Sequence, residues 1–323
     1  MKALVTGGAG FIGSHLAEAL LRMSVEVVVL DNLELGDRRN LHWGEGLPGL
    51  EFVEGDVRDE TLVRRLVVGC DWVFHEAALP SVPRSVQQPL QTNEHNVDGT
   101  LRLLVAARDA KVKRFLFASS SSIYGDSDAP LKHEGLPPNP MSPYALQKYT
   151  GERYCQLFHR LYGLPTVALR YFNVFGPRQR HDSPYSGVIA RFCTAFLASE
   201  RPMIYGDGLQ SRDFTYIENV IRANLLAVQA PIEKVAGRVL NIACGGSIDL
   251  LRLVAELQKL TGLKLEPRFE PQRTGDVRSS RADVQAAREI LGYDPSVPFA
   301  EGLRHTLDWY RGVPGRRETL DAC

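Results

Sequence analysis

The chain has 323 residues, of which 44% are hydrophobic and 24% charged, a composition typical of a globular protein with room for about two cores. It excludes a wholly disordered chain. The 38 basic and 38 acidic residues cancel, so the chain lacks the broad positive field with which proteins attract nucleic acid or anionic lipid. An anionic ligand would therefore need a local site.

The sequence also argues against a membrane span, a secretion signal and a bound metal. Its longest aliphatic stretch, residues 25–30, is interrupted by Glu26 and is far shorter than the roughly 20 residues of a membrane crossing. Glycine at position 7 comes too early for the apolar centre of a secretion signal, so we expect a cytoplasmic protein. The five cysteines form no C-x-x-C pair and the eight histidines no close ligand pair, which predicts buried thiols and no metal site.

Short runs of β-branched residues alternate with amphipathic stretches in the first half of the chain, a pattern that predicts β-α-β units and a parallel sheet. We predict six strands, enough for a full doubly wound sheet, at residues 2–6, 25–30, 51–53, 71–75, 114–118 and 166–171. Helices are predicted near residues 11–22, 60–67, 90–107 and 142–161.

After about Pro177 the spacing loosens, and the pattern predicts a smaller α/β domain. A further strand is expected at residues 239–242, with helices near 218–228, 250–260, 284–291 and 300–310. We assign residues 1–173, with a return segment at about 214–243, to the sheet domain, and residues 174–213 and 244–311 to the smaller one. Residues 312–323 lack apolar periodicity and are expected to form a frayed tail.

Three glycines mark a candidate dinucleotide site. Gly7, Gly10 and Gly13 lie where the first strand turns into the first helix, and glycine there allows a tight turn and the approach of a pyrophosphate to the helix N-terminus. Such turns also occur for packing alone. Asp31 follows 18 residues after Gly13, at the end of the second strand, where a carboxylate can bind ribose hydroxyls and repel a 2′-phosphate, so NAD is favoured over NADP. Its alternative is a turn residue together with Asn32.

The segment after the third strand offers a second cofactor contact. Asp56 and Val57 in GDVRD could meet the adenine. Asp56 could equally be the N-cap of the following helix.

A tyrosine and a lysine four positions apart form the candidate reactive pair. Tyr144 and Lys148 share one helix face, and the serine run at residues 119–122 follows the fifth strand at the carboxyl edge of the sheet, where such folds bind ligands. Lowering the pKa of a phenol from about 10 to about 7 requires about 4 kcal/mol. One lysine about 5 Å away supplies about 3 kcal/mol at an effective dielectric constant of about 20, and burial opposes it. An oxidised nicotinamide would supply the second positive charge, although the same spacing also occurs as an ordinary helix-face pair.

Several motifs in order resemble the extended short-chain dehydrogenase/reductase family, and within it the UDP-hexose 4-epimerases. They cover most of the chain: TGGAGFIG at 6–13, HEAA at 75–78, SSSSIYG at 119–125, SPYALQK at 142–148, RYFNVFGPRQ at 170–179, GDGLQSRDF at 206–214 and GDVRSSRAD at 275–283. The resemblance implies an NAD-binding Rossmann domain, a nucleotide-sugar-binding domain and a homodimer formed through the helices near 90–107 and 142–161.

In such epimerases bound NAD accepts a hydride from the 4-carbon of the sugar, a 4-keto sugar turns its opposite face, and the returned hydride inverts that carbon. The resemblance makes Tyr144 the base and later the acid. Lys148 would bind the nicotinamide ribose and lower the pKa of Tyr144, and Ser120 would hydrogen-bond the 4-oxygen. The full set of expected cofactor contacts is Gly7, Gly10, Phe11, Ile12, Gly13, Asp31, Asn32, Asp56, Val57, Ala77, Ala78, Tyr144 and Lys148.

The resemblance also implies a UDP-sugar site. Its expected residues are Ser81, Ser120, Ser121, Ser122, Tyr144, Asn173, Gln179, Arg212, Arg273, Asp276 and Ser280. Arg212 and Arg273 match diphosphate-binding arginines, whose guanidinium groups suit a pyrophosphate. Their alternative is a pair of solvent-exposed ion pairs with Asp213 and Asp276.

Five positions bear on which substrate is used. Ser121 and Ser122 stand where related dehydratases and decarboxylases carry acids, and Asn173 stands where uronate 4-epimerases usually carry threonine, which favours a neutral UDP-hexose. Ser280 replaces a bulky tyrosine of epimerases limited to glucose and galactose, and Ser81 matches a serine that can bind an N-acetyl group, so N-acetyl sugars are expected as substrates.

Two departures from the family pattern, Glu76 and Pro80, fall in the segment that shapes the sugar pocket.

Three alternatives to a UDP-hexose 4-epimerase stay open. They are a UDP-uronate 4-epimerase, another NAD-dependent nucleotide-sugar oxidoreductase, and a sensor that binds these ligands without turnover.

Overall fold

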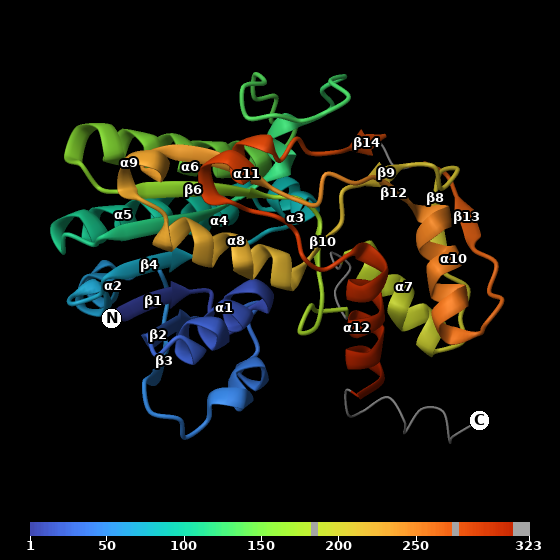
Figure 1. Ribbon diagram of the computed structural model, residues 1–323, viewed down its shortest axis with the longest axis horizontal. Coiled ribbons are helices and arrows are strands. Elements are labelled where there is room, and N and C mark those ends of the chain that lie inside the picture. The colour runs from blue at the N-terminus through green and yellow to red at the C-terminus, as the bar shows by residue number, and fades with distance from the viewer. Residues whose placement is uncertain (182–186, 273–277, 313–323) are drawn as a thin grey trace.

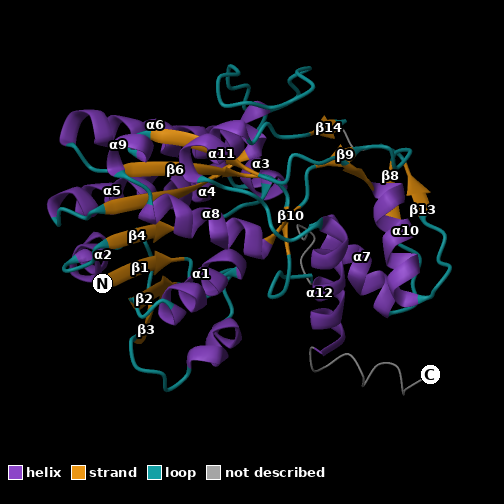
Figure 2. Cartoon of the chain, viewed as in Figure 1, coloured by secondary structure: helices purple, strands orange, loops and turns teal. Residues whose placement is uncertain are grey.

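The computed structural model describes residues 1–181, 187–272 and 278–312. At its centre is a parallel sheet with the strand order β11-β6-β5-β4-β1-β2-β3 (Figure 2). The strands are β1 (Lys2–Thr6), β2 (Glu26–Asp31), β3 (Leu50–Glu54), β4 (Trp72–His75), β5 (Arg114–Ser120), β6 (Thr166–Tyr171) and β11 (Arg238–Ile242). All six strands expected from the first half of the chain are present, and the strand expected at 239–242 joins them as a seventh beside β6. Because the strand order reverses at β1, the carboxyl ends of β1 and β4 border the crevice where such sheets bind ligands.

Helices cover both faces of this sheet (Figure 1). Alternate residues of β1 point to opposite faces: Ala3 and Val5 join one core and Leu4 the other. The first core packs against α1 (Phe11–Arg22) and α8 (Ile217–Gln229), and the second against α2 (Glu60–Val67), α5 (Gly99–Asp109) and α6 (Pro143–Tyr162). Strands covered on both faces need apolar residues at nearly every position, which explains the continuous aliphatic runs of β1 and β2.

The helix expected at 90–107 is interrupted by a π-helical turn. A short α3 (Val82–Gln87) precedes α4 (Pro89–Asn93), and a π-helical turn over Glu94–Asp98 separates α4 from α5. The side chain of Asn96 in this turn accepts a hydrogen bond from the backbone N–H of Leu79 at 2.8 Å and donates one to Gln147 of α6 at 2.8 Å. The wider turn thus ties the loop after β4 to the helix that carries Tyr144.

A second region packs at the carboxyl edge of the sheet (Figure 1, right). Its helices are α7 (Val188–Leu197), α10 (Leu250–Thr261) and α12 (Phe299–Gly312). Two small sheets accompany them: β8 (Met203–Tyr205) with β13 (Arg268–Glu270), and β9 (Ser211–Arg212) between β12 (Ile248–Asp249) and β14 (Ser279–Ser280). The apolar core continues without a break from β1 into this region, since Phe192 and Ile204 belong to the same buried cluster as Val5.

The remaining described elements are short segments between those already named. They are η1 (Arg38–Gly44), η3 (Ser121–Tyr124), β7 (Val174–Phe175), β10 (Thr215–Tyr216), α9 (Ile232–Val235) and α11 (Gln285–Leu291). α11 falls in the segment 244–311 but packs against β11, α8 and α9 on the sheet side. The domain boundaries proposed from the sequence stay a prediction.

Two further sequence expectations concern membrane helices and cysteines. None of the helices in the described ranges combines the length and the apolar character needed to cross a bilayer. Cys70, Cys155 and Cys193 are buried free thiols, as expected, whereas Cys244 is only partly buried. Cys323 lies outside the described residues.

Candidate active site

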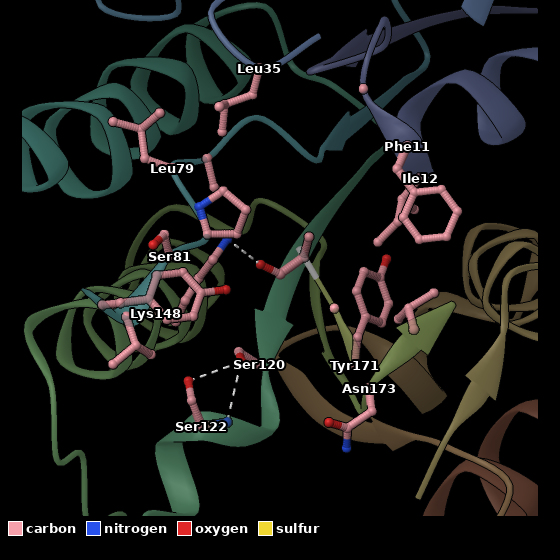
Figure 3. Close-up of a pocket in the computed structure, with 18 of the residues that line it drawn as sticks. Phe11, Ile12, Leu35, Leu79, Ser81, Ser120, Ser122, Lys148, Tyr171 and Asn173 are labelled. Atoms are coloured by element: carbon pink, nitrogen blue, oxygen red, sulfur yellow. Dashed lines mark hydrogen bonds between the residues drawn. The ribbon is translucent and has the colours of Figure 1, made fainter. Parts of the chain in front are cut away.

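A cavity of about 1290 Å³ lies at the carboxyl edge of the sheet and extends into the second region (Figure 3). It brings together most of the residues expected to bind cofactor and substrate. Those that line it are Gly7, Gly10, Phe11, Ile12, Gly13, Asp31, Asn32, Val57, Ala77, Ala78, Ser81, Ser120, Ser121, Ser122, Tyr144, Lys148, Asn173, Gln179, Arg212 and Ser280. Arg273 and Asp276 lie outside the described residues. Among the described residues, no group of three His, Cys, Asp or Glu side chains is placed to hold a metal ion.

The glycine turn between β1 and α1 has both a packing role and an open face. Gly7 has a φ of +68°, and a Cβ there would lie 2.7 Å from the backbone nitrogen of Ala77. A Cβ on Gly13 would lie 2.3 Å from the carbonyl oxygen of Gly7. The turn also places the N-terminus of α1, which has no acidic residue in its first turn, at the cavity wall. Its free N–H groups and positive dipole end suit a pyrophosphate, so the residues present fit a dinucleotide.

Asp31 ends β2 and bonds the turn that follows it, while ribose binding by Asp31 stays a prediction. Its carboxylate accepts hydrogen bonds from the backbone N–H groups of Ala9 at 3.0 Å and Leu33 at 2.9 Å, and it lines the cavity. Burial raises the pKa of Asp31, while these backbone bonds oppose the rise. The residue therefore shapes the turn after β2 and leaves a carboxylate edge toward the cavity.

Asp56 points to its protein neighbours. Its carboxylate accepts two bonds from the Arg58 side chain and one from the Arg58 backbone N–H, each at 2.8–2.9 Å, and one from Asn32 at 2.9 Å. Burial opposes ionisation, but these bonds outweigh it and hold the pKa of Asp56 well below its usual range. The helix-cap alternative for Asp56 is wrong, because α2 is capped by Asp59, which accepts from the N–H of Leu62 at 3.0 Å. Val57, not Asp56, lines the cavity.

The candidate catalytic residues meet in the middle of the cavity. Tyr144 lies in the first turn of α6, where Ser142 caps the helix by accepting from the N–H of Ala145. One turn later, Lys148 donates from Nζ to the carbonyl oxygen of Ala118 at 2.7 Å. Ser120, at the end of β5, hydrogen-bonds Tyr144 and accepts a bond from the hydroxyl of Ser122 at 2.9 Å.

Burial controls the ionisation of this pair. Burial raises the pKa of Tyr144 to about 12, although the hydrogen bond from Ser120 opposes the rise. Burial also lowers the pKa of Lys148 to about 8, and the carboxyl group of Glu76 opposes that fall. The phenol is thus protonated at neutral pH in the protein alone, and it requires added positive charge nearby before it can act as a base.

Glu76 is the acidic neighbour of this pair, and the sequence marked it only as a departure from a pattern. Its Oε1 accepts a hydrogen bond from the Tyr171 hydroxyl at 2.9 Å, and Tyr171 also contacts Asn224 of α8. Burial raises the pKa of Glu76 to about 7, with Tyr171 and Lys148 opposing the rise. No periodicity or spacing links positions 76, 148 and 171; only the convergence of β4, α6 and β6 does.

At the other end of the cavity, Arg212 and Ser280 are paired across β9 and β14. The expected alternative, a solvent-exposed ion pair between Arg212 and Asp213, is wrong: Asp213 is fully buried, and its carboxylate accepts from the backbone N–H groups of Cys244 at 3.0 Å and Ala282 at 3.2 Å. Burial raises the pKa of Asp213 to about 6, against these backbone bonds.

Two further substrate candidates have structural roles of their own. Asn173 has a φ of +35°, a conformation that asparagine tolerates and a β-branched threonine does not. The backbone thus supplies a second reason for asparagine at this position. The Ser81 hydroxyl caps α3 by accepting from the N–H of Arg84 at 3.1 Å, which leaves its own hydrogen to donate into the cavity.

Comparisons with known proteins agree with this geometry. A model of the NAD dependent epimerase/dehydratase family matches residues 3–243. A UDP-glucose 4-epimerase from Mycolicibacterium smegmatis is 40% identical over 96% of this chain and 99% of its own length. A UDP-N-acetylglucosamine 4-epimerase from Methanobrevibacter ruminantium, solved with UDP-N-acetylmuramic acid, superposes with a TM-score of 0.92 at 39% identity, covering 96% of this chain and 98% of that one. A UDP-glucuronic acid 4-epimerase from Bacillus cereus, solved with UDP-glucuronic acid and NAD, gives a TM-score of 0.89 at 34% identity over 96% and 99%.

Proposed function

The chain belongs to the NAD dependent epimerase/dehydratase family, and from this premise we propose that it is an isomerase that uses bound NAD to interconvert UDP-hexoses at the 4-carbon. The observation that carries the proposal is the shared cavity. Tyr144, Lys148 and Ser120 line it together with the glycine turn of β1 and α1 and the Arg212 side chain. A dinucleotide at the turn and a nucleotide sugar at Arg212 would meet at Tyr144.

In the proposed reaction the chain supplies proton transfer and orientation. When bound, NAD would accept a hydride from the 4-carbon and return it to the opposite face. Tyr144 takes the proton of the 4-hydroxyl and later returns a proton to the 4-oxygen, while Ser120 donates a hydrogen bond beside it. The Lys148 ammonium group stabilises the phenolate, and its attraction to Glu76 keeps that ammonium group charged in a buried position.

For the substrate we propose neutral UDP-hexoses, including the N-acetyl sugars. The small Ser280 side chain at the cavity wall and the Ser81 hydroxyl support room and a donor for an N-acetyl group. Relatives that act on UDP-glucose and on UDP-N-acetylglucosamine support both sugar types. The second candidate is a UDP-uronate 4-epimerase, which the Bacillus cereus structure favours.

The direct test supplies UDP-galactose, UDP-N-acetylgalactosamine and UDP-glucuronate separately, without added NAD, and resolves the products. We expect both neutral sugars to be converted to their 4-epimers with no net accumulation of NADH. Conversion of UDP-glucuronate alone would favour the uronate enzyme. A requirement for added NAD with a stoichiometric yield of NADH would indicate a net dehydrogenase.

Substitutions at two tyrosines of α6 distinguish an enzyme from a protein that only binds the ligands. Tyr144→Phe is expected to abolish epimerisation while the protein still binds NAD. Tyr149→Phe on the same helix is the matched control, because Tyr149 does not belong to the cavity wall, and it should keep wild-type turnover. If the wild-type protein binds NAD and converts none of the sugars, the sensor alternative replaces the proposal.

We also propose a cytoplasmic homodimer. The dimer is supported by large apolar side chains that are exposed on α4 and α6, since Leu90 is 81% and Leu146 54% exposed. Light scattering after size-exclusion chromatography tests the dimer, and Leu90→Glu combined with Leu146→Glu should yield a monomer if these helices form the interface.

A further inference from the structure

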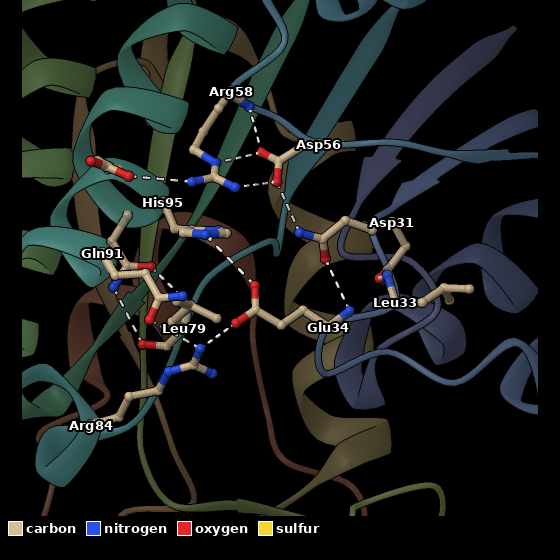
Figure 4. A network of polar contacts seen from close by, with 12 residues as sticks. Asp31, Leu33, Glu34, Asp56, Arg58, Leu79, Arg84, Gln91 and His95 are labelled. Atoms are coloured by element: carbon tan, nitrogen blue, oxygen red, sulfur yellow. Dashed lines mark hydrogen bonds and ion pairs between the residues drawn. The ribbon is translucent and has the colours of Figure 1, made fainter. Parts of the chain in front are cut away.

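An ion pair joins two segments that line the cavity near Asp31 (Figure 4). Glu34 lies in the loop after β2, and its Oε1 pairs with Nη2 of Arg84 in α3. Both residues line the cavity, and their side chains are only 29% and 19% exposed. Fifty positions separate them in the chain, so the contact is a tertiary link between the loop that follows Asp31 and the helix that follows Ser81.

Neighbouring side chains hold both partners in place (Figure 4). Gln91 of α4 accepts from Arg84 Nη2 at 3.2 Å, and His95 of the π-helical turn lies with Nε2 3.6 Å from Glu34 Oε2. On the other wall, Asn32 accepts from the backbone N–H of Glu34 at 3.1 Å, and its amide group donates to Asp56. The pair is therefore built into a network that spans two loops and three helical segments.

The position of the pair relates it to the cofactor. Asp31, the expected ribose-binding carboxylate, precedes Glu34 by three residues and lines the same wall. Gly36 closes the loop behind it, since a Cβ there would lie 2.5 Å from Asp31 Oδ1. An adenosine held at Asp31 and Val57 would thus lie beside a link that joins the β2 loop to α3.

We propose that the Glu34–Arg84 pair is a clasp that retains NAD by closing the adenosine end of the cavity. The inference rests on the proposed use of NAD. Release of the adenosine requires the β2 loop to move away from α3, and that movement breaks the ion pair and exposes it to water. Because the side chains are largely shielded, their attraction is screened less than that of a solvent-exposed pair.

The proposed clasp predicts that loss of the ion pair speeds the exchange of bound NAD. This exchange can be measured without an activity assay. Protein loaded with isotopically labelled NAD is freed of excess ligand and mixed with unlabelled NAD, and the label that remains bound is followed by mass spectrometry after denaturation. Arg84→Gln and Glu34→Gln are each expected to speed exchange about tenfold. The double variant should exchange no faster than the faster single variant, since each change removes the same contact.

Two further variants make the result decisive. Arg64→Gln, which removes an exposed cation paired with Glu60 and Asp109 away from the cavity, should exchange as the wild type does. Arg84→Lys keeps the charge but loses the planar fork, so it should exchange NAD at an intermediate rate. It replaces Arg84→Gln as the test if the uncharged variant fails to fold. Wild-type exchange rates in both single variants, or additive effects in the double variant, would overturn the clasp alone. A wild-type protein that binds no NAD would overturn the clasp together with the proposed cofactor.

Discussion

The backbone N–H of Tyr144 donates a hydrogen bond to the hydroxyl oxygen of Ser85, 3.1 Å away, across 59 positions of the chain. The first N–H groups of a helix have no partner within that helix. In α6 the caps are divided: Ser142 serves Ala145, and Ser85 of α3 serves Tyr144. Ser85 itself is fully buried and donates to the carbonyl oxygen of Val82 at 2.7 Å. The short helix α3 therefore anchors the backbone of Tyr144, the proposed base.

Replacing this cap should affect both stability and turnover. Ser85→Ala leaves the buried N–H of Tyr144 unsatisfied, which costs about 1–3 kcal/mol of unfolding free energy. Because Tyr144 loses its anchor, we expect kcat to fall several-fold with little change in the KM for the UDP-sugar. Thr150→Ala on the same helix is the control, since the Thr150 hydroxyl bonds its own helix at an exposed site. Denaturant unfolding and steady-state kinetics measure the two effects, and equal kcat values for the two variants would contradict the anchoring role.

The ionisation of Tyr144 should depend on the cofactor. Without it, burial raises the pKa of Tyr144 to about 12, whereas a base active near pH 7 needs about 7 kcal/mol of added stabilisation of the phenolate. A lysine about 5 Å away gives about 3 kcal/mol at an effective dielectric constant of about 20, so the remainder must come from a second cation.

This dependence can be measured by absorbance. The difference in phenolate absorbance between the wild type and Tyr144→Phe isolates this tyrosine during a pH titration. In the cofactor-free protein we expect no Tyr144 titration below about pH 10, the ordinary value for a phenol, and with oxidised NAD bound we expect a midpoint near neutrality. Lys148→Met should raise the midpoint of the NAD-bound form. An unchanged midpoint on NAD binding would exclude the cofactor as the second cation.

Glu76 should make folding stability depend on pH. Burial raises its pKa to about 7, from an ordinary value of 4.5. Between these values the native state keeps a proton that the unfolded chain releases, so stability falls as pH rises through this range. Glu76→Gln keeps an acceptor for Tyr171 and removes the charge. We expect the unfolding free energy of the variant to match that of the wild type below pH 4.5. Above pH 7 it should be higher by at most about 3 kcal/mol, and the lost attraction between Glu76 and Lys148 reduces this gain.

Denaturant unfolding at several pH values tests this expectation. Burial lowers the pKa of Lys148 to about 8 and Glu76 opposes that fall, so Lys148 makes stability rise with pH, with the opposite sign to Glu76. Glu60→Gln, at a half-exposed carboxylate on α2, is the control and should show no comparable gain. A Glu76→Gln variant that is less stable than the wild type at pH 8 would mean that the attraction to Lys148 outweighs the burial of the carboxyl group.

Much of the sheet could be predicted because its signals are local. Strands covered on both faces, such as β2, read as continuous aliphatic runs, and the glycine turn and the Tyr144–Lys148 spacing are short-range patterns. Parallel topology then places the ends of β1, β4, β5 and β6 at one edge. This is why residues as distant in the chain as Gly7 and Tyr144 line one cavity.

The links between elements could not be predicted, because they depend on tertiary packing. The π-helical turn at Glu94–Asp98 has no sequence pattern of its own, yet it directs Asn96 to Leu79 and Gln147. Nothing near Ser85 or Arg84 in the sequence indicates that one caps α6 and the other pairs with Glu34. Asp56 shows the same limit. Its position suggested a helix cap, but its carboxylate accepts hydrogen bonds from Arg58 and from Asn32 in the loop after β2.

The last prediction concerns the size of the sugar pocket at Ser280. This residue lines the cavity on β14, directly beside Arg212 on β9. Ser280→Tyr adds a ring at the wall, and well-packed sites do not absorb such a volume without strain. We expect the variant to lose turnover of UDP-N-acetylgalactosamine at least a hundredfold, about 2.7 kcal/mol in transition-state binding, while turnover of UDP-galactose changes little.

The neighbouring Ser279 supplies the control. It lies on the same strand, its hydroxyl bonds Ser211 at an exposed site, and Ser279→Tyr should leave the ratio of the two activities unchanged. A hundredfold preference of the wild type for UDP-galactose would show that Ser280 does not open the pocket to N-acetyl groups. If Ser280→Tyr lowers both activities equally, the added ring disturbs Arg212 and the diphosphate it is proposed to bind. The residues that discriminate between the two sugars would then lie elsewhere in the cavity, and Ser81→Ala would be the next variant to test.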